Sequence, residues 1–553
     1  MKYLFLIAFF YSLISKAQEF KSINEHLKTV QTSKASFRQE LKPLEESMFQ
    51  YSVVQIDTKG REEEIQYNFS FSDIDQNTVR SITKKDLISV QLLVKNRQKL
   101  VQVVTNGGDK VSYTNQFEFL ATNAENGKVL ERLIKQIIPK AVLKEENRLA
   151  LNGYQAHINW LLKNLSDVEL PKKQIIQKSS VGKIPGKLIL DQTFNTKSKS
   201  KNELREFNLA IMNPSSIGYQ ISGEEFIISL DTRRGVNGIK YVEDGTQKNY
   251  DSTIKLYAKS IANGKDLYKV LRSLIPLSKT VFKKSWPTIT TPESALKFLN
   301  AAIAEVGTTE EILTQNLTIQ DNITQLKLTE TKPNESTEFI YRFNFADINA
   351  NNIDYDGQRD RLFAVLPIKK SVNFIQFQKN GELQNYTKDT RIYFNTIEDA
   401  IIGTKALQSL ANIYEDKIST THYSTTSAET SVAKLNSITK KVKIGEDNYD
   451  IFIELIDEKT TTIKITTVFS NLKKSIETVQ EFSLKDINPK NCTINVKGKH
   501  VLVELNTKHL EKIVKTYLDG AIKPYQYKIS IEVKGIEEAR QVVGIFKKII
   551  EKT

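Results

Sequence analysis

Few side chains in this sequence have the types and spacing that an active site requires. No two of the five histidines have the His-Glu-x-x-His spacing that places two metal ligands on one helical face. Cys492 is the only cysteine, so the chain has neither an internal disulfide nor a cysteine pair for a metal. We therefore expect no metal site and no cofactor. The histidines are His26, His157, His422, His500 and His509.

Other catalytic patterns are also missing or incomplete. There is no Gly-x-Ser-x-Gly elbow, and Gly182 to Lys187 has one residue too few for a phosphate loop and lacks the Ser or Thr that should follow. We interpret this segment as a turn between strands. Asp73, Asp347 and Asp486 recur in a repeated phrase, but an Asx residue that ends a strand already forms a turn, so we do not expect paired catalytic carboxylates. The sequence predicts a protein that is not an enzyme.

Positive charge is concentrated in one part of the chain. The formal net charge is +14, and residues 151–287 hold 22 Lys and Arg against 12 Asp and Glu. Loops that carry one sign of charge attract anions, which predicts contact with a lipid headgroup, an anionic glycan or an acidic protein. The alternative is that these residues serve solubility alone. The candidate anion-binding residues are Lys172, Lys173, Lys183, Lys187, Lys197, Lys199, Lys201, Arg233 and Arg234.

The N-terminus has the pattern of an export signal. Lys2 precedes the apolar run Leu4 to Ile14, and Ser15-Lys16-Ala17 places small residues before a cut at Gln18. No later run reaches the roughly 18 apolar residues of a membrane-spanning helix. We expect an exported, disulfide-free protein of a bacterial envelope, in the periplasm rather than at the cell surface because the chain ends on an amphipathic helix. Nucleic acid is not an expected partner, since no basic motif is interleaved with aromatic residues.

One short phrase occurs four times. It begins at Phe69, Phe207, Phe343 and Phe482, at intervals of 138, 136 and 139 residues. A second set of anchors, Phe117, Ile254, Ile392 and Ile529, recurs at intervals of 137, 138 and 137 residues. A period this long matches a globular domain, so the sequence predicts four tandem repeats of about 137 residues. Their predicted bounds are 18–150, 151–288, 289–417 and 432–553, after a signal peptide at 1–17 and with a Ser/Thr-rich linker at 418–431.

Each repeat has the same expected order of elements. Apolar residues three and four apart predict an opening helix, such as Leu296, Leu299 and Ile303, with Asn300 and Asn436 on the wet faces of such helices. Alternation then predicts antiparallel strands, in the first repeat at 51–57, 64–71, 89–94, 100–105 and 116–120, and a last strand leads to a closing helix. Cys492 replaces a β-branched residue and should be a small buried hydrophobe.

This α+β unit, a helix, a bent antiparallel sheet and a C-terminal helix, resembles the pleckstrin-homology-like architecture in its order of elements. We expect a non-enzymatic binding or scaffold protein. Binding of a lipid or small hydrophobic ligand within each β-unit is the first alternative, and it predicts an unfilled apolar cavity in every repeat. An enzyme of unrecognised type is the second, and it requires titratable residues that converge in one cleft.

Overall fold

The computed structural model describes residues 21–45, 47–108, 110–419, 427–459 and 461–552. The predicted signal peptide at 1–17 and the central part of the predicted linker, 420–426, lie outside these residues. The chain divides into two compact units, Met1–Ser285 and Trp286–Thr553. Each unit contains two copies of one sheet motif, so the predicted α+β class is confirmed together with the recurrence of a sheet motif.

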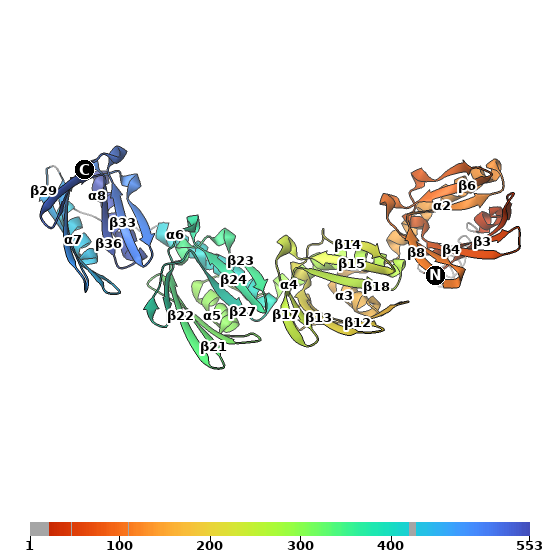
Figure 1. Ribbon diagram of the computed structural model, residues 1–553, viewed down its shortest axis with the longest axis horizontal. Coiled ribbons are helices and arrows are strands. Elements are labelled where there is room, and N and C mark those ends of the chain that lie inside the picture. Colours follow the sequence, from red (N-terminus) through yellow and green to blue (C-terminus); the bar gives the residue numbers. More distant parts are fainter. Residues whose placement is uncertain (1–20, 46, 109, 420–426, 460, 553) are drawn as a thin grey trace, which may run out of the picture. The chain divides into compact units, whose positions relative to one another are not determined.

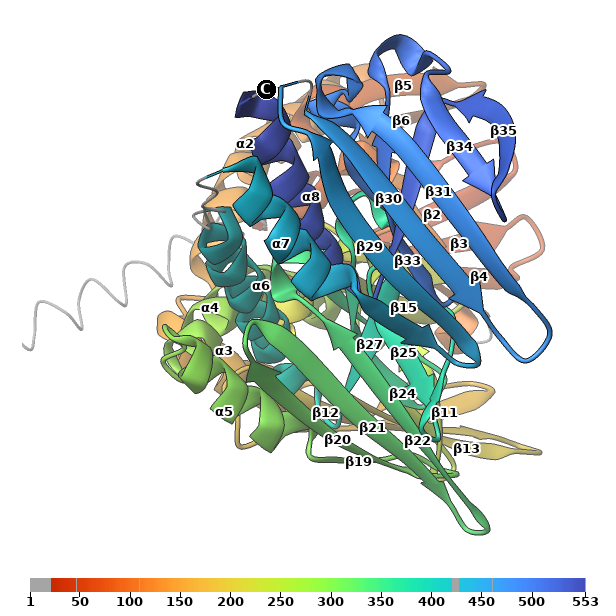
Figure 2. The same cartoon turned by 90° about the vertical axis from the view of Figure 1, so that its left-hand side faces the viewer.

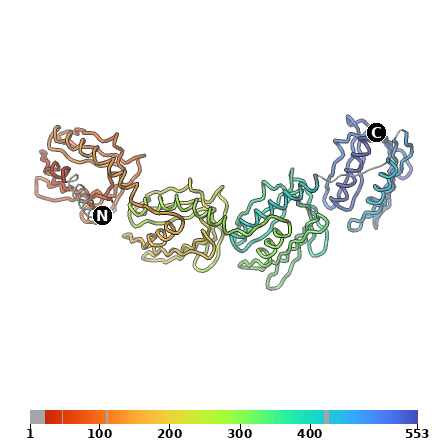
Figure 3. The backbone as a smooth tube through the Cα atoms, turned by 180° about the vertical axis from the view of Figure 1, so that it is seen from behind, coloured from red at the N-terminus to blue at the C-terminus, as the bar shows by residue number. Residues whose placement is uncertain are grey.

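The motif pairs a six-stranded antiparallel sheet with a three-stranded antiparallel sheet, and it occurs four times in the described part of the chain. We number the occurrences modules 1 to 4. Each module is a continuous stretch of chain (Figure 3). In module 1 the larger sheet has the order β1(Val30–Gln31), β2(Ala35–Pro43), β3(Phe49–Asp57), β4(Glu62–Phe69), β7(Val101–Thr105), β8(Lys110–Thr114), and the smaller has β5(Arg80–Lys84), β6(Leu87–Leu93), β9(Gln116–Ala121).

The other modules repeat these two orders (Figure 1). Module 2 has β10(Val168–Leu170), β11(Lys173–Val181), β12(Lys187–Thr196), β13(Ser200–Asn208), β16(Ile239–Glu243), β17(Thr246–Asp251), with β14(Gly218–Ser222), β15(Glu225–Asp231), β18(Thr253–Ala258). Module 3 has β19(Glu305–Gly307), β20(Ile312–Gln320), β21(Ile323–Lys332), β22(Glu335–Phe343), β25(Gln376–Lys379), β26(Glu382–Leu383), with β23(Asp354–Gln358), β24(Arg361–Pro367), β27(Asp389–Phe394). Module 4 has β28(Lys441–Ile444), β29(Asp447–Asp457), β30(Thr462–Ser470), β31(Ser475–Ser483), β34(Val514–Leu518), β35(Ala521–Gln526), with β32(Thr493–Lys497), β33(His500–Asn506), β36(Lys528–Val533).

An opening helix and a closing helix complete each module, as the apolar periodicity predicts. From module 2 onward the two helices pack against each other, and Figure 2 shows this for the last pair. Residues 21–26 are the described part of the first opening helix. The others are α2(Ala124–Asn147), α3(Gly153–Asn164), α4(Ile261–Lys284), α5(Pro292–Ile303), α6(Ile397–Ser419), α7(Ala428–Thr439) and α8(Ile536–Lys552).

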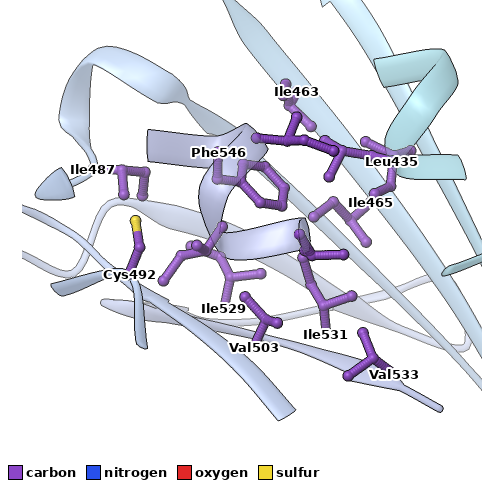
Figure 4. Packing of buried hydrophobic residues seen from close by; sticks show 14 of the residues in the cluster. Leu435, Ile463, Ile465, Ile487, Cys492, Val503, Ile529, Ile531, Val533 and Phe546 are labelled. Carbon is purple, nitrogen blue, oxygen red and sulfur yellow. The ribbon is translucent and has the colours of Figure 1, made fainter. Parts of the chain in front are cut away.

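The core of module 4 lies between its two sheets and its helices (Figure 4). Ile463 and Ile465 of β30 face Ile529 and Ile531 of β36, because alternate residues of a strand point to the same face. Phe546 of α8 fills the space between them. Cys492 belongs to this core with 2% of its surface exposed, which confirms its predicted burial.

The repeated phrase forms the end of a core strand followed by one 3-10 turn. In module 1 the strand ends at Phe69 and the turn is Phe71–Asp73. The last residue of the phrase, Asp75, then accepts a hydrogen bond from the Asn77 amide at 3.0 Å. Asn488 caps its turn in the same way. The predicted strand end and Asx turn are therefore correct, but the capping residue is the last one of the phrase and not Asp73.

Two expected boundaries and one expected anchor residue were wrong. The connection predicted from Pro139 onward is helical, since α2 runs through Pro139 to Asn147 and its turns before the proline bury Ile134 and Ile138. Ala428 to Ser431, predicted as linker, form the first turn of α7. In module 3 the residue equivalent to Ile254 is Thr390 and not Ile392, because both start the buried alternation of their strands.

Asn300 and Asn436 were predicted on the wet faces of their helices, and this was wrong. Each side chain forms two hydrogen bonds with the backbone of one strand residue. Asn436 Nδ2 donates to the Ile453 carbonyl at 2.7 Å, and the Ile453 amide donates to Asn436 Oδ1 at 2.8 Å. Asn300 binds Leu317 identically, and Asn24 binds Leu41. A side-chain amide thus occupies backbone groups of the strand that faces the opening helix.

A buried glutamine joins the two sheets of a module by the same principle. Gln315 of β20 donates to the Tyr393 carbonyl of β27 at 3.0 Å and accepts from the Tyr393 amide at 2.9 Å. Gln177 makes the same pair of bonds to Tyr257 in module 2, and Gln39 to Leu120 in module 1. Polar residues that recur along the chain therefore satisfy backbone groups inside the modules.

The two hydrogen bonds between the Asn436 side chain and the Ile453 backbone predict a specific loss of stability when they are removed. Asn436→Ala leaves the amide and carbonyl of Ile453 without their partners, which should cost about 1–3 kcal/mol. Denaturant unfolding and hydrogen exchange at Ile453 measure the loss. Lys434→Ala, an exposed change on the same helix, is the control. An Asn436→Ala protein as stable as the control would contradict this prediction.

Burial raises the pKa of the Cys492 thiol to about 11. At pH 8 only about one thiol in a thousand is then ionised, and the thiolate is the reactive form. We expect the native protein to resist a thiol-specific reagent at pH 8 and to react fully in denaturant. Rapid labelling of the native protein would contradict the buried position.

Candidate functional site

Within the first unit, modules 1 and 2 are joined through the repeated phrase. Lys265, in the second turn of α4, places its Nζ 2.6 Å from Asp73 Oδ1 and 3.3 Å from Ser72 Oγ. The Asp73 side chain is 11% exposed. Its other oxygen, Oδ2, has no hydrogen-bond partner in the described part of the chain. Burial raises the pKa of Asp73 although Lys265 acts to lower it. The Asp73 carboxylate is therefore shielded from water, and Lys265 provides the positive charge that compensates it.

A second ion-pair group joins the same two modules. Arg148 binds Asp266 of α4, with Nη1 2.7 Å from Oδ2, and also binds Glu145 at the end of α2. Lys269 Nζ donates to the Glu145 carbonyl at 2.8 Å. The continuation of α2 beyond Pro139 is what brings Glu145 and Arg148 to this junction.

Modules 3 and 4, in the second unit, meet through equivalent residues. Arg540 of α8 donates to both oxygens of Asp347, at 3.0 and 2.8 Å. Glu537 accepts from Asn344 Nδ2 at 3.1 Å, and the Tyr386 amide donates to the Gly498 carbonyl at 3.0 Å. Burial raises the pKa of Asp347 while Arg540 lowers it.

Asp73 and Asp347 lie in the phrase turn, as predicted. Their side chains do not cap it, and form ion pairs with the next module. The signal missed in the sequence is the cation five residues into the following closing helix, Lys265 in α4 and Arg540 in α8. Asp486, in module 4, occupies the same place in its turn.

A cleft of about 800 Å³ opens beside the junction of modules 1 and 2. Its lining combines polar and apolar residues and carries charges of both signs. Lys173 is already paired within the module, since its Nζ lies 2.8 Å from Glu225 and 4.9 Å from the centre of the Phe194 ring. Lys99 and Lys172 are exposed at its surface. The charged and aromatic lining residues are Lys99, Tyr113, Lys172, Lys173, Glu224 and Glu225.

The predicted anion-binding residues do not form one patch. Lys172 and Lys173 stand where β11 begins, Lys197 and Lys199 lie between β12 and β13, and Lys201 is the second residue of β13. These five share one end of the larger sheet, because Lys173 pairs with Thr196. Lys183 and Lys187 stand at the opposite end of β11 and β12. Arg233 and Arg234 are in a 3-10 turn beyond β15.

Several of these cations are paired inside module 2. Lys201 Nζ lies 2.9 Å from Glu203 and 2.6 Å from Glu243, and hydrogen bonds to these two carboxylates raise its pKa. Lys187 pairs with Glu206 at 3.3 Å. Lys172, Lys183, Lys197, Lys199 and Arg234 are exposed.

Arg233 has a structural explanation. Its Nε donates to the Met212 carbonyl at 3.2 Å, beside the turn formed by the repeated phrase. Lys95 and Lys369 take the same position in modules 1 and 3 and donate to the carbonyls of Ser72 and Ala346 at 2.9 and 2.8 Å. A cation here supports the phrase turn in each of these modules, so Arg233 needs no ligand to account for it.

Module 1 also has an apolar cleft of about 310 Å³ between its sheets. Phe37, Val53, Tyr67 and Leu120 are among its lining residues. In module 3 the equivalents of Phe37, Val53 and Leu120 are packed together in one buried cluster. The residues that line a cleft in module 1 thus have equivalents that pack together in module 3. The hydrophobic-ligand alternative instead predicts an unfilled cavity in every module.

No model of a known protein family matches this chain. A search of curated proteins finds no similar sequence. Within the described residues, no group of three or more His, Cys, Asp and Glu side chains is arranged to hold a metal ion. Helices long and apolar enough to cross a membrane are absent from the same residues.

Replacing either member of the Asp73–Lys265 ion pair should lower stability by a different amount. Lys265→Met leaves Asp73 buried without its cation and should cost about 2–4 kcal/mol at neutral pH. Asp73→Asn removes the charge itself and should cost much less. Hydrogen exchange in residues 70–75 of the full chain measures junction opening, and Asp73→Asn with Lys265→Met is the control.

The pH dependence follows from the raised pKa of Asp73. The folded protein takes up this proton before the unfolded chain does, so acidification relieves the buried charge. The penalty of Lys265→Met should be full at neutral pH and should shrink as the pH falls through the raised pKa. A penalty that grows on acidification would contradict this account.

Proposed function

We propose that the chain is an exported, non-enzymatic binding or scaffold protein of the bacterial cell envelope. In this proposal, four tandem copies of one domain, at 18–150, 151–288, 289–417 and 432–553, form the mature protein. The nearly equal spacing of the phrase and the recurrence of both sheets support the duplication. The resemblance to the pleckstrin-homology-like architecture stays a prediction from element order, and the periplasmic location stays a prediction from the sequence.

One observation carries the scaffold proposal. Ionisable residues that recur in the modules are paired with one another at the junctions, as in Asp73 with Lys265 and Asp347 with Arg540. Buried carboxylates that face a cation hold two surfaces in register, whereas a catalytic acid or base needs access to a substrate. Such pairing supports a protein whose modules present surfaces in a fixed relation within each unit.

The partner we propose is an anionic envelope component or an acidic protein that binds one end of module 2. Lys172, Lys197 and Lys199 are exposed at that end, and Lys172 borders the 800 Å³ cleft with Lys99. A glycan or a lipid headgroup supplies the required negative charge. Exposed lysines attract such a partner at moderate ionic strength and lose it as salt increases.

A second candidate function is binding of a small apolar ligand in module 1. It rests on the open cleft of about 310 Å³, whose aromatic lining includes Phe37, Tyr67 and Phe117. Pockets of this kind hold small ligands mainly through apolar contact. This candidate requires only one module and makes no use of the basic end of module 2.

Charge reversal tests the anionic partner. We expect Lys172→Glu, Lys197→Glu and Lys199→Glu together to abolish capture of envelope components by the tagged mature protein, as measured by lipid and protein mass spectrometry. Lys163→Glu, Lys178→Glu and Lys255→Glu, all exposed in the same module and outside the candidate set, change the charge equally and are the control. The proposal fails if both variants retain every association. Bound lipid that survives both variants favours the apolar cleft.

A further inference from the structure

The two junctions follow one rule of position. The third residue of the phrase turn, Asp73 or Asp347, binds the fifth residue of the next closing helix, Lys265 or Arg540. The partners are separated by 192 residues in the first unit and by 193 in the second. The same surface of one module thus receives the same helix of the next.

Two charges of this series have no partner among the described residues. The turn position holds Asp73, Ile211, Asp347 and Asp486, and the helix position holds Lys128, Lys265, Ile401 and Arg540. Ile211 and Ile401 contribute no charge. Lys128 of module 1 and Asp486 of module 4 form no ion pair in the described ranges, and Lys128 is exposed. One is a cation and the other is a carboxylate, as at the two observed junctions.

The surroundings of Asp486 also match a receiving surface. In module 3, Tyr386 is 5% exposed and packs with Phe374 against the core of module 4. Ile513 and Tyr525 are their equivalents in module 4, since Tyr386 precedes the partner of Ile375 and Tyr525 precedes the partner of Val514. Ile513 is 39% exposed and Tyr525 47% exposed. Apolar side chains therefore remain uncovered on the described part of module 4, at the positions that module 3 buries.

The residues around Lys128 in α2 resemble those around Arg540 in α8, the helix that module 3 receives. The helix α8 carries Glu537 three residues before Arg540, and Glu537 accepts a hydrogen bond from Asn344. The helix α2 carries Glu125 three residues before Lys128. Ser483 of module 4 stands at the position of Asn344, so it also offers a hydrogen-bonding side chain to a glutamate.

We propose that module 4 of one copy binds module 1 of a second copy head to tail, with Asp486 paired to Lys128 and with Ile513 and Tyr525 covered. The contact reproduces the junction between modules 3 and 4. It is heterologous, since different surfaces meet, so each added copy leaves another receiving surface exposed and the assembly grows as an open chain. This inference goes beyond the proposed function and requires no anionic ligand.

One difference makes the contact between copies weaker than the junction within a copy. A Cβ at Gly498 would lie 3.2 Å from Asn385 Oδ1, so the glycine lets the turn approach module 3 closely. Module 1 has Lys85 at this position of its own hairpin, with a positive φ of 57°. We therefore expect association that depends on protein concentration and weakens with salt.

Sedimentation velocity of the mature full-length protein, with its tag removed, tests the proposal over a range of concentration. We expect the wild type to form species larger than the monomer. Lys128→Asp and Asp486→Lys should each weaken association at least tenfold, because each places like charges at the contact. Lys59→Asp and Glu446→Lys, exposed changes in the same modules, are the matched controls.

Mixing the two variants gives the decisive result. The Lys128→Asp protein offers Asp at both surfaces and the Asp486→Lys protein offers Lys at both, so an equal mixture should recover association that neither shows alone. A wild type that stays monomeric at every concentration overturns the proposal. So does association that the two variants leave unchanged, or a mixture that remains monomeric. None of these results depends on whether an envelope ligand binds module 2.

Discussion

The structure of each unit depends on a carboxylate that is buried where two modules meet. Removing a carboxylate from water costs several kcal/mol unless a cation and hydrogen bonds compensate it. Asp73 and Asp347 both belong to the turn that ends a core strand, so their positions are fixed by the sheets. The cation must therefore come to the carboxylate. Its helix is fixed in turn, and the core of one module sets the placement of the next.

The same constraint acts inside the modules at lower cost. Backbone amides and carbonyls at the margins of the sheets need partners, and side-chain amides supply them. Asn436 on Ile453 and Gln315 on Tyr393 each satisfy one donor and one acceptor. Polar residues at recurring positions are therefore explained by repeated backbone geometry. Recurrence alone is not a sign of catalysis in such a chain.

The periodicity of apolar residues correctly predicted which residues lie on the same face of a strand or helix. The strand expected at 51–57 is β3, Phe49–Asp57, and the buried site of Cys492 is correct. Periodicity does not name the partner of a polar residue. Asn300 is half-buried and resembles a surface residue until the strand beneath it is known. Pro139 resembles a helix end because its cost is local, whereas the packing that continues α2 past it is tertiary.

The candidate site shows the same limit for electrostatics. An excess of positive charge in module 2 was visible in the sequence, but its distribution depended on carboxylates far away in the chain. Lys173 meets Glu225, and Lys201 meets Glu243, across strands that only the fold brings together. The number of Lys and Arg residues therefore overstates the cations available to a ligand, since each internal pair uses one of them. Lys128 and Asp486 differ from these paired cations. Their equivalents at the two junctions are paired, whereas they themselves form no ion pair in the described residues.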